Sequence, residues 1–342
     1  MNFLRHSFNY FKKTPIRSTI SRPSIPMDDY NNNKSSFISK NNFIHPEYQY
    51  LDVLYDTVYN SEKRNGRNGL VYSVFGRKME FDITNYKVPL LSTKKVYGKM
   101  AGKELLFFLK GQTNAKILTG QGVPIWEPNT TRNFLNNNNL AHYEEGDMGP
   151  MYGFQWLHFG TKYVNCDHDY SKQGFNQFEY VLKKLKTDPF SRRIMMTTYN
   201  PAQADEGVLF PCHGISIVFD VSSNYELSCG MTMRSNDIFL GNPFNIFQYS
   251  FLVHIMCKLI NNDNEYTGTK FSPGKLCVFL NNVHLYEEHL EQAKEQLLRT
   301  PLLSLPHIEF MNNPKEIKEI NLKNIKICNY EHLPEIKGKM VA

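Results

Sequence analysis

Cys212 differs from the other five cysteines of the chain in its neighbours, because it lies in the tetrapeptide Phe210-Pro211-Cys212-His213. Proline fixes the backbone that enters this position, and a cysteine at the start of a strand beside His213 could be exposed and activated. A thiolate is a strong nucleophile when nearby positive charge keeps it ionised. Free cysteines are more often buried structural thiols, so the tetrapeptide alone leaves both interpretations open.

Several arginines occur in contexts that suit a phosphate group. Arg67 lies in a glycine-containing turn, Arg192 and Arg193 are adjacent before a predicted strand, and Arg234 is followed by Ser235. A phosphate is bound by several guanidinium groups together with a hydroxyl, although a single arginine is more often a solvated surface charge. Neither the G-x-x-x-x-G-K-[ST] nor the G-x-G-x-x-G motif occurs, so the sequence predicts no phosphate-cradling loop of those types.

Three further residues could act on a bound substrate. His284 and Tyr286 are two positions apart, so in an extended strand they share a face, where they could bind a sugar hydroxyl or serve only the structure. Glu104 stands among apolar residues, where it is either solvent-facing on an amphipathic helix or buried with a raised pKa. No cluster of cysteines and histidines has zinc-ligand spacing, so we expect no metal.

The composition indicates a globular protein with a sizeable core, since 41% of the 342 residues are hydrophobic and 21% are charged. No run of about 18 apolar residues occurs, so we expect no membrane span. The formal charge is +6, but residues 1–27 hold five Arg and Lys residues and no acidic one. The remainder is close to neutral and has no broad nucleic-acid footprint. Six scattered cysteines without a C-x-x-C pair indicate a reducing compartment, and we expect a cytoplasmic protein.

The chain divides into an N-terminal segment over residues 1–44 and a folded body over residues 45–342. Residues 1–27 have the composition of a mitochondrial presequence or of a basic disordered tail, and residues 28–42 are polar enough to be a linker. Hydrophobic periodicity predicts helices over 48–60, 103–110, 175–186, 244–260 and 285–299, and strands over 71–75, 194–199, 215–221, 227–233 and 276–280. Strands and helices mixed without a βαβ rhythm predict an α+β fold.

Read together, these segments resemble the thymidylate synthase family, in its eukaryotic-type form, from about Tyr48 to the last residue. The resemblance rests on segments that match in order and spacing, which include Val88-Pro-Leu-Leu-Ser-Thr-Lys, Gly111-Gln-Thr-Asn-Ala-Lys, Gly146-Asp-Met-Gly-Pro-Met-Tyr-Gly-Phe-Gln-Trp, Pro211-Cys-His, Arg234-Ser-Asn-Asp, Leu240-Gly-Asn-Pro-Phe-Asn-Ile and Val283-His-Leu-Tyr. It implies a twisted mixed β-sheet with flanking helices, one sheet face forming a homodimer interface. Because only about 45 residues precede the body, we expect no fused dihydrofolate reductase domain before it.

The resemblance also implies an activity, the reductive methylation of dUMP to dTMP with 5,10-methylenetetrahydrofolate, which leaves as dihydrofolate; no metal or nicotinamide is implied. The implied catalytic residues are Cys212, Glu104, Tyr152, Arg234 and Asp237. The implied dUMP-binding residues are Arg67, Arg192, Arg193, His213, Ser235, Asn245, His284 and Tyr286, with Arg192 and Arg193 acting across the dimer interface. The implied folate-binding residues are Ile125, Trp126, Asn129, Asp237, Leu240, Gly241, Phe244 and Ala342.

Chemistry explains why such residue types are needed. Addition of the Cys212 thiolate to uracil C6 turns C5 into a nucleophile, and Glu104 and Tyr152 would move protons through ordered water. The amide of Asn245 can accept from uracil N3–H and donate to O4, whereas cytosine inverts that pattern. We therefore expect Asn245→Asp to shift preference toward dCMP, measured as the ratio of kcat/KM for the two nucleotides; an unchanged ratio would contradict this.

The sequence departs from the family pattern at several positions. Met233 stands where glutamine is usual, the Arg67 turn is one residue short, and the chain ends in Val341-Ala342 rather than in alanine and a larger aliphatic residue. The tail normally shields the intermediate from water, so poor closure would favour a dUMP hydroxymethylase, whereas Trp126 favours methylation. A non-catalytic relative that binds nucleotide or RNA is the alternative of another class.

Overall fold

A six-stranded mixed sheet organises the molecule, which is described here from a computed structural model covering residues 27–66 and 68–341. The strand order is β1-β2-β6-β5-β4-β3, and only the β5–β6 pair is parallel. The bounds are β1 (Glu62–Gly66), β2 (Gly69–Asp82), β3 (Met195–Met196), β4 (Ser216–Val221), β5 (Glu226–Asp237) and β6 (Ser272–Tyr286). Strands β7 (His307–Phe310) and β8 (Ile325–Cys328) form a separate antiparallel pair.

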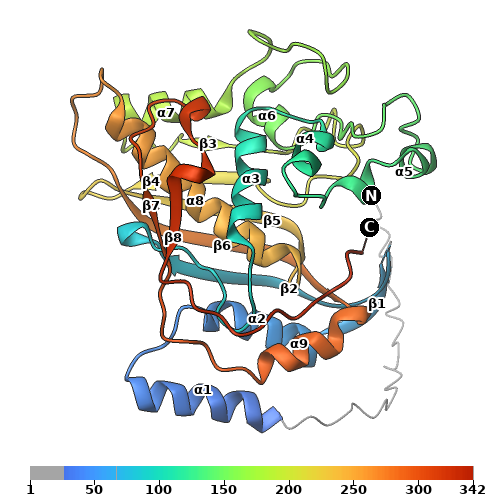
Figure 1. Ribbon diagram of the computed structural model, residues 1–342, viewed down its shortest axis with the longest axis vertical. Coiled ribbons are helices and arrows are strands. Elements are labelled where there is room, and N and C mark those ends of the chain that lie inside the picture. The colour runs from blue at the N-terminus through green and yellow to red at the C-terminus, as the bar shows by residue number, and fades with distance from the viewer. Residues whose placement is uncertain (1–26, 67, 342) are drawn as a thin grey trace, which may run out of the picture.

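Nine α-helices flank this sheet in the part of the chain that the structure describes (Figure 1). They are α1 (Met27–Asn41), α2 (Tyr48–Tyr59), α3 (Gly98–Leu109), α4 (Ala115–Gly120), α5 (Arg132–Asn137), α6 (Gly153–His158), α7 (Gln177–Thr187), α8 (Gly241–Asn262) and α9 (Leu290–Leu297). The expected architecture, a mixed sheet with flanking helices, is therefore confirmed.

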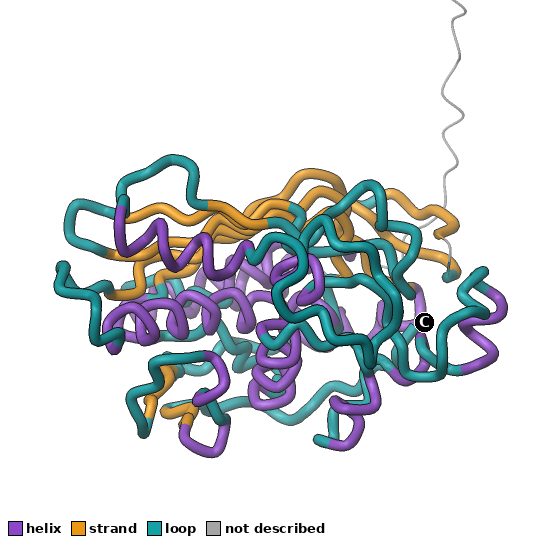
Figure 2. Tube along the Cα trace, turned by 90° about the horizontal axis from the view of Figure 1, so that it is seen from above, coloured by secondary structure: helices purple, strands orange, loops and turns teal. Residues whose placement is uncertain are grey.

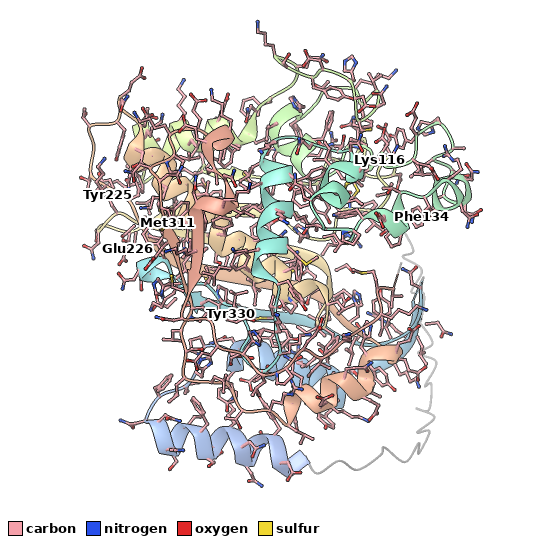
Figure 3. All side chains as sticks on the ribbon, viewed as in Figure 1. Lys116, Phe134, Tyr225, Glu226, Met311 and Tyr330 are labelled. Carbon is pink, nitrogen blue, oxygen red and sulfur yellow. The ribbon has the colours of Figure 1, made fainter. Side chains whose placement is uncertain are left out.

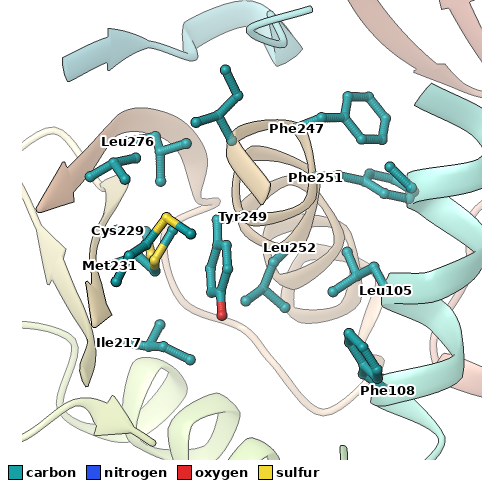
Figure 4. Packing of buried hydrophobic residues seen from close by; sticks show 14 of the residues in the cluster. Leu105, Phe108, Ile217, Cys229, Met231, Phe247, Tyr249, Phe251, Leu252 and Leu276 are labelled. Atoms are coloured by element: carbon teal, nitrogen blue, oxygen red, sulfur yellow. The ribbon is translucent and has the colours of Figure 1, made fainter. Parts of the chain in front are cut away.

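Helix α8 is the centre of the core, and it packs on β5 and β6 on one side and on α3 on the other. Nearly every residue from Asn245 to Ile260 is buried, which explains why the apolar run in the sequence shows no amphipathic stripe. Figure 4 shows Tyr249 and Leu252 of α8 between the sheet residue Met231 and Phe108 of α3. The position of α8 places its first turns beside the strand ends that carry Arg234 and His284.

The opposite face of the sheet lacks such a cover among the described residues. In Figure 2 the strands of the six-stranded sheet form one layer, and the helices, most loops and the separate β7–β8 pair lie on one side of it. On the uncovered face, Met195, Val218 and Phe279 are 47%, 41% and 45% exposed. Three large apolar side chains exposed on one sheet face form an apolar patch, and such patches often mark a surface that binds another molecule.

The expectation that residues 28–42 form a linker was wrong, because Met27–Asn41 is helix α1. Although the segment is polar, it places Tyr30 and Phe37 in the core, against Tyr48 of α2. The Tyr30 hydroxyl also donates to Asp52 Oδ1 at 2.7 Å. A few well-placed aromatic residues thus fix a helix whose average composition predicts none.

Two other expected elements are shorter than predicted. The strand expected over 194–199 is limited to Met195–Met196, because the backbone from Thr197 onward bonds to the Gln177 side chain and to Gly214 instead. The helix expected over 285–299 begins only at Leu290, because β6 continues to Tyr286. The helices expected at 48–60, 103–110, 175–186 and 244–260 are confirmed, as are the strands at 215–221 and 227–233. The strands expected at 71–75 and 276–280 are present within the longer strands β2 and β6.

The basic segment on which the presequence prediction rests lies outside the described residues, except for Met27. Among residues 27–66 and 68–341, no helix combines the length and apolar character that a membrane crossing needs.

Candidate active site

A cavity of about 640 Å³ opens between the ends of β5 and β6, the first turns of α8 and helix α3. Sixteen of the predicted site residues line it: Cys212, Glu104, Tyr152, Arg234, Asp237, His213, Ser235, Asn245, His284, Tyr286, Ile125, Trp126, Asn129, Leu240, Gly241 and Phe244. Residues separated by up to 182 positions in sequence therefore meet in one cavity. Arg67 and Ala342 lie outside the described residues, although their neighbours Asn68 and Val341 line the cavity.

The sulfur of Cys212 lies at the cavity wall under the guanidinium of Arg234. One Nη of Arg234 is 3.9 Å from Cys212 Sγ, while Nε donates to Pro211 O at 3.0 Å. The same guanidinium stacks on the Phe210 ring, 4.7 Å from its centroid. These contacts hold a fixed positive charge beside the sulfur, and such a charge favours the thiolate.

His213 supplies no positive charge to this cysteine. Its ring is buried, and burial lowers its pKa to about 3, so the imidazole is neutral at physiological pH. Its Nδ1 lies 2.9 Å from the Tyr249 hydroxyl. Gly214 permits this approach, because it has a φ of +66° and a Cβ there would lie 2.3 Å from the Tyr249 oxygen.

Tyr152 is held in a strained backbone conformation with a φ of +37°, which a tyrosine rarely adopts. Its ring stacks on His213 at 4.4 Å and on Phe108 at 4.9 Å. Its hydroxyl accepts from the backbone N–H of Cys212 at 3.3 Å. Burial, and after it the nearby Cys212, raises the pKa of Tyr152 well above its usual range, so this hydroxyl stays protonated beside the sulfur.

Glu104 is buried on α3, and the structure therefore selects the second of the two interpretations that the sequence left open. Burial raises its pKa to about 7, and hydrogen bonds from Trp126 and Gln248 oppose that rise. Trp126 Nε1 donates to Oε1 at 2.7 Å, and Gln248 Nε2 donates to Oε2 at 2.6 Å. A carboxyl group poised near neutral pH suits general acid and base catalysis.

His284 and Tyr286 share a face of β6, as predicted, with ring centroids 5.3 Å apart. Burial lowers the pKa of His284, and the charges of Arg64 and Arg234 act in the same direction. Arg64 also lines the cavity, where its guanidinium donates to Ser73 Oγ at 2.7 Å. Arg64 was not among the predicted site residues, although the tripeptide Arg-Asn-Gly occurs twice in succession over residues 64–69 and either copy could supply the arginine.

The opposite side of the cavity is largely apolar and includes Ile125, Trp126, Leu240 and Phe244. Two polar groups interrupt it. The Asp237 carboxylate accepts from the backbone N–H groups of Phe239 and Leu240 at 3.0 and 3.1 Å, which fixes the turn before α8. Asn129 has a buried side-chain nitrogen that finds no hydrogen-bond partner among the described residues. Such an orphaned donor suits a ligand with its own polar edge.

The C-terminal segment closes one side of this cavity with Met340 and Val341. Several contacts anchor it, including Arg299 Nη1 to Pro334 O at 2.6 Å and His289 Nε2 to Lys339 O at 2.9 Å. Tyr330, labelled in Figure 3, donates to Leu91 O at 2.9 Å. By contrast, Arg192 and Arg193 are exposed and do not line the cavity of their own chain.

A second group of donors lies apart from the cavity on the β7–β8 hairpin. One donor atom from each of His307, Glu309 and Cys328 lies within 4.8 Å of the others. None of the three lines the cavity, and the reaction proposed below does not use them.

Residues 48–342 match the thymidylate synthase family model. The chain is similar to the thymidylate synthases of Candida albicans (39% identity over 86% of this chain and 97% of that protein) and Saccharomyces cerevisiae (37%, 86% and 96%). It is also similar to the bifunctional dihydrofolate reductase-thymidylate synthase of Plasmodium chabaudi, with 38% identity over 87% of this chain. It spans about half, 49%, of that relative's length.

Proposed function

The chain belongs to the thymidylate synthase family, and on that premise we propose that it methylates dUMP to dTMP. The carbon donor is 5,10-methylenetetrahydrofolate, which also supplies the hydride and leaves as dihydrofolate. One observation carries the proposal: the Cys212 sulfur beside Arg234, the Asn245 amide and the buried Glu104 carboxyl all line one cavity. The catalytic unit is residues 45–342.

Cys212 begins the reaction. Its thiolate forms a bond to uracil C6, and the electron pair of the C5–C6 bond moves toward C5 and O4. Arg234 stabilises the thiolate before attack and stands beside the adduct afterwards. The neutral His213 and the protonated Tyr152 flank this position without adding charge. In this mechanism the guanidinium of Arg234 therefore supplies the fixed positive charge that activates the Cys212 thiolate.

Glu104 and Tyr152 handle protons in the later steps. A carboxyl with a pKa of about 7 is partly ionised at neutral pH, so it can give and take a proton near uracil O4 and the folate nitrogen. Tyr152, with water, is positioned to help remove the proton from C5. The apolar side chains of Ile125, Trp126 and Phe244 limit the access of bulk water, which otherwise competes with hydride.

The folate fits the apolar side of the cavity. Trp126 and Leu240 offer flat and aliphatic surface to a pterin ring, and the unpartnered Asn129 nitrogen offers a donor to its polar edge. Asp237, although engaged by two backbone N–H groups, still has a second carboxylate oxygen for the same ligand.

We further propose that the enzyme acts as a homodimer formed through the uncovered face of the sheet. Arg192 and Arg193 are exposed outside their own cavity, which is the placement required if they bind the phosphate in the partner's site. Mixing Cys212→Ser chains with Arg192→Ala/Arg193→Ala chains should restore activity, since each mixed dimer holds one complete site. Two inactive parents that stay inactive after mixing would exclude this arrangement.

A single incubation tests the reaction. The purified protein is mixed with dUMP and 5,10-methylenetetrahydrofolate, dihydrofolate is followed by its near-UV absorbance, and the nucleotide is weighed by mass spectrometry. We expect equal amounts of dihydrofolate and dTMP from the wild type and from Cys328→Ser, a control outside the cavity, and neither from Cys212→Ser. Hydroxymethyl-dUMP without dihydrofolate would replace methylation by hydroxymethylation. Nucleotide binding without product would indicate a non-catalytic relative.

We propose a cytoplasmic location on the basis of the cysteines. None of the six cysteines, all of which lie in the described part of the chain, forms a disulfide, which is typical of a reducing compartment such as the cytoplasm. A reporter fused to residues 1–27 tests the alternative, because its import into mitochondria would assign that organelle and a cytosolic reporter would retain the cytoplasmic assignment.

A further inference from the structure

Gln248 connects two of the groups just described. It lies on α8, one helical turn after Asn245, and its side chain is buried. Its Nε2 donates to Glu104 Oε2 at 2.6 Å and to the backbone oxygen of Ala101 at 3.1 Å. Both partners accept hydrogen bonds, so both N–H groups of Gln248 must point toward α3. The orientation of this amide is thereby fixed, and its oxygen points away from α3.

The oxygen of Gln248 in turn orients Asn245. Asn245 Nδ2 donates to Gln248 Oε1 at 3.4 Å, which uses one of its two N–H groups. Asn245 Oδ1 lies on the side of Gly241, 3.8 Å from where a Cβ on that glycine would be, and both residues line the cavity. The carbonyl oxygen and the second N–H of Asn245 are therefore the groups left for a ligand.

This orientation matters because an asparagine amide has nearly the same shape after a half-turn about its last bond. In one orientation it accepts from N3–H and donates to O4 of uracil. In the other it donates to N3 and accepts from N4–H of cytosine. The identity of Asn245 alone therefore does not choose between the two bases. A half-turn in this chain would bring Asn245 Oδ1 against Gln248 Oε1, two acceptors without a proton between them.

We propose that Gln248 is a specificity-determining positioning residue, which holds Asn245 in the orientation that binds uracil and excludes cytosine. The proposal rests on the proposed function, since it takes dUMP as the substrate. Gln248 touches neither base nor folate in this account. It acts through Asn245, and its own orientation is set by Glu104 and Ala101.

Two substitutions test separately the hydrogen bonds that Gln248 makes to Asn245 and to Glu104. Gln248→Met keeps the length of the side chain and removes all of its polar atoms, so Asn245 is free to rotate. Gln248→Glu keeps an acceptor for Asn245 but sets a second carboxyl group against Glu104. Ser250→Ala is the matched control, because Ser250 is equally buried on α8 and its hydroxyl bonds only to Phe247 O, at 2.7 Å.

The measurement is the preference for dUMP over dCMP, obtained from calorimetric dissociation constants and from kcat/KM. For Gln248→Met, or for Gln248→Ala if the methionine variant does not fold, we expect the preference to fall about 10- to 100-fold, the size expected for a buried hydrogen bond that is lost or mismatched. Gln248→Glu should keep the preference for binding dUMP over dCMP within about threefold of the wild-type value. Its pH profile for dUMP turnover should shift to higher pH, because the second carboxyl group raises the pKa of Glu104. Ser250→Ala should match the wild type in both.

Three results would overturn the proposal: an unchanged preference in Gln248→Met with the fold retained, an equal loss in Ser250→Ala, or a loss in Gln248→Glu as large as in Gln248→Met. Failure of the proposed function is distinguishable from these. If the wild type binds dUMP more tightly than dCMP but forms no dTMP, the reaction is wrong, and the binding arm still decides the role of Gln248. If the wild type forms dTMP but does not distinguish the two nucleotides, the proposal for Gln248 fails and the proposed reaction is retained.

Discussion

Two glutamates on opposite sides of the central sheet have pKa values displaced in opposite directions. Glu104 lies on α3, on the side covered by α8, where burial raises its pKa to about 7. Glu80 lies on β2, on the uncovered face, where hydrogen bonds from Lys78 and Lys275 lower its pKa to about 2. The side chains are identical, so the environment alone sets the difference: a dry pocket disfavours the charge, and two cations in water favour it.

The same contrast divides neighbouring residues of one strand. In β4, Phe219 points into the hydrophobic core and is 2% exposed, whereas Val218 points the other way and is 41% exposed. Both positions are apolar, but only one is covered by the described part of the chain. The covered side carries the polar groups whose chemistry depends on exclusion of water, and the other side is the one that we propose associates with a second copy.

The largest expected effect comes from placing a charge on the uncovered face. Val218→Asp would bury two unpaired carboxylates in a symmetric dimer, each costing several kcal/mol. We therefore expect the protein to become monomeric in analytical ultracentrifugation and to lose at least about 100-fold in activity at low protein concentration, because Arg192 and Arg193 no longer reach a partner. Val164→Asp, at a site 51% exposed elsewhere on the surface, should change neither. A Val218→Asp protein that stays dimeric would place the interface elsewhere.

Truncating a side chain on the covered face should lower stability independently of protein concentration, unlike truncating one on the uncovered face. Phe219→Ala leaves a cavity in the hydrophobic core and should lower the free energy of unfolding by about 3–5 kcal/mol. That loss belongs to the core of one chain, so it should be the same at low and high protein concentration in urea titrations. For Val218→Ala we expect less than about 1.5 kcal/mol, and a dependence on concentration. Equal behaviour of the two variants would mean that the faces are not distinct.

The pKa of Glu104 measures how strongly the covered side of the sheet excludes water. Its pKa rises from 4.5 to about 7 on folding, so the folded state holds its proton more tightly than the unfolded state does. Its contribution is fully present below pH 4.5 and is lost as the pH rises through 7, a change on the order of 3 kcal/mol. Glu104→Gln removes that titration. We expect its stability to change less between pH 5 and pH 8 than that of the wild type, whatever its offset at pH 5; equal slopes in urea titrations would contradict the assignment.

Much of this arrangement could be predicted from the sequence, and the failures have physical causes. The buried run over 244–260 predicted α8 because length and apolarity suffice for a helix buried on all sides. The strand over 276–280 was too short by ten residues, since β6 spans Ser272–Tyr286. Its second half carries Asn282 and His284, which line the cavity, and such polar residues break the pattern by which a strand is recognised.

The site residues could be predicted where a family motif fixes the residue type. They could not be predicted where a role depends on how closely two elements approach each other in the folded chain. Sixteen predicted residues line the cavity. Residue type and neighbours alone had already made candidates of Cys212, Glu104, Arg234, Ser235, His284 and Tyr286, whereas most of the others, and the specific roles, were obtained from the resemblance. Arg64 was missed because two identical tripeptides compete for one role. The contacts of Gln248 depend on how closely α3 approaches α8, and no local pattern encodes that distance.

The smallest expected effect belongs to Glu80, and it completes the comparison. Its side chain is 36% exposed, so solvent screens its pairs with Lys78 and Lys275, and such pairs contribute about 0–1 kcal/mol. Because its pKa is lowered, that contribution is present above pH 4.5 and is lost as the pH falls toward 2. Glu80→Gln should therefore differ from the wild type by less than about 1 kcal/mol at pH 6, less still at pH 3 or in about 1 M salt. Glu104→Gln has the opposite pH dependence, so a Glu80→Gln effect that became smaller as the pH rose from 3 to 6 would show that solvent exposure does not separate the two faces.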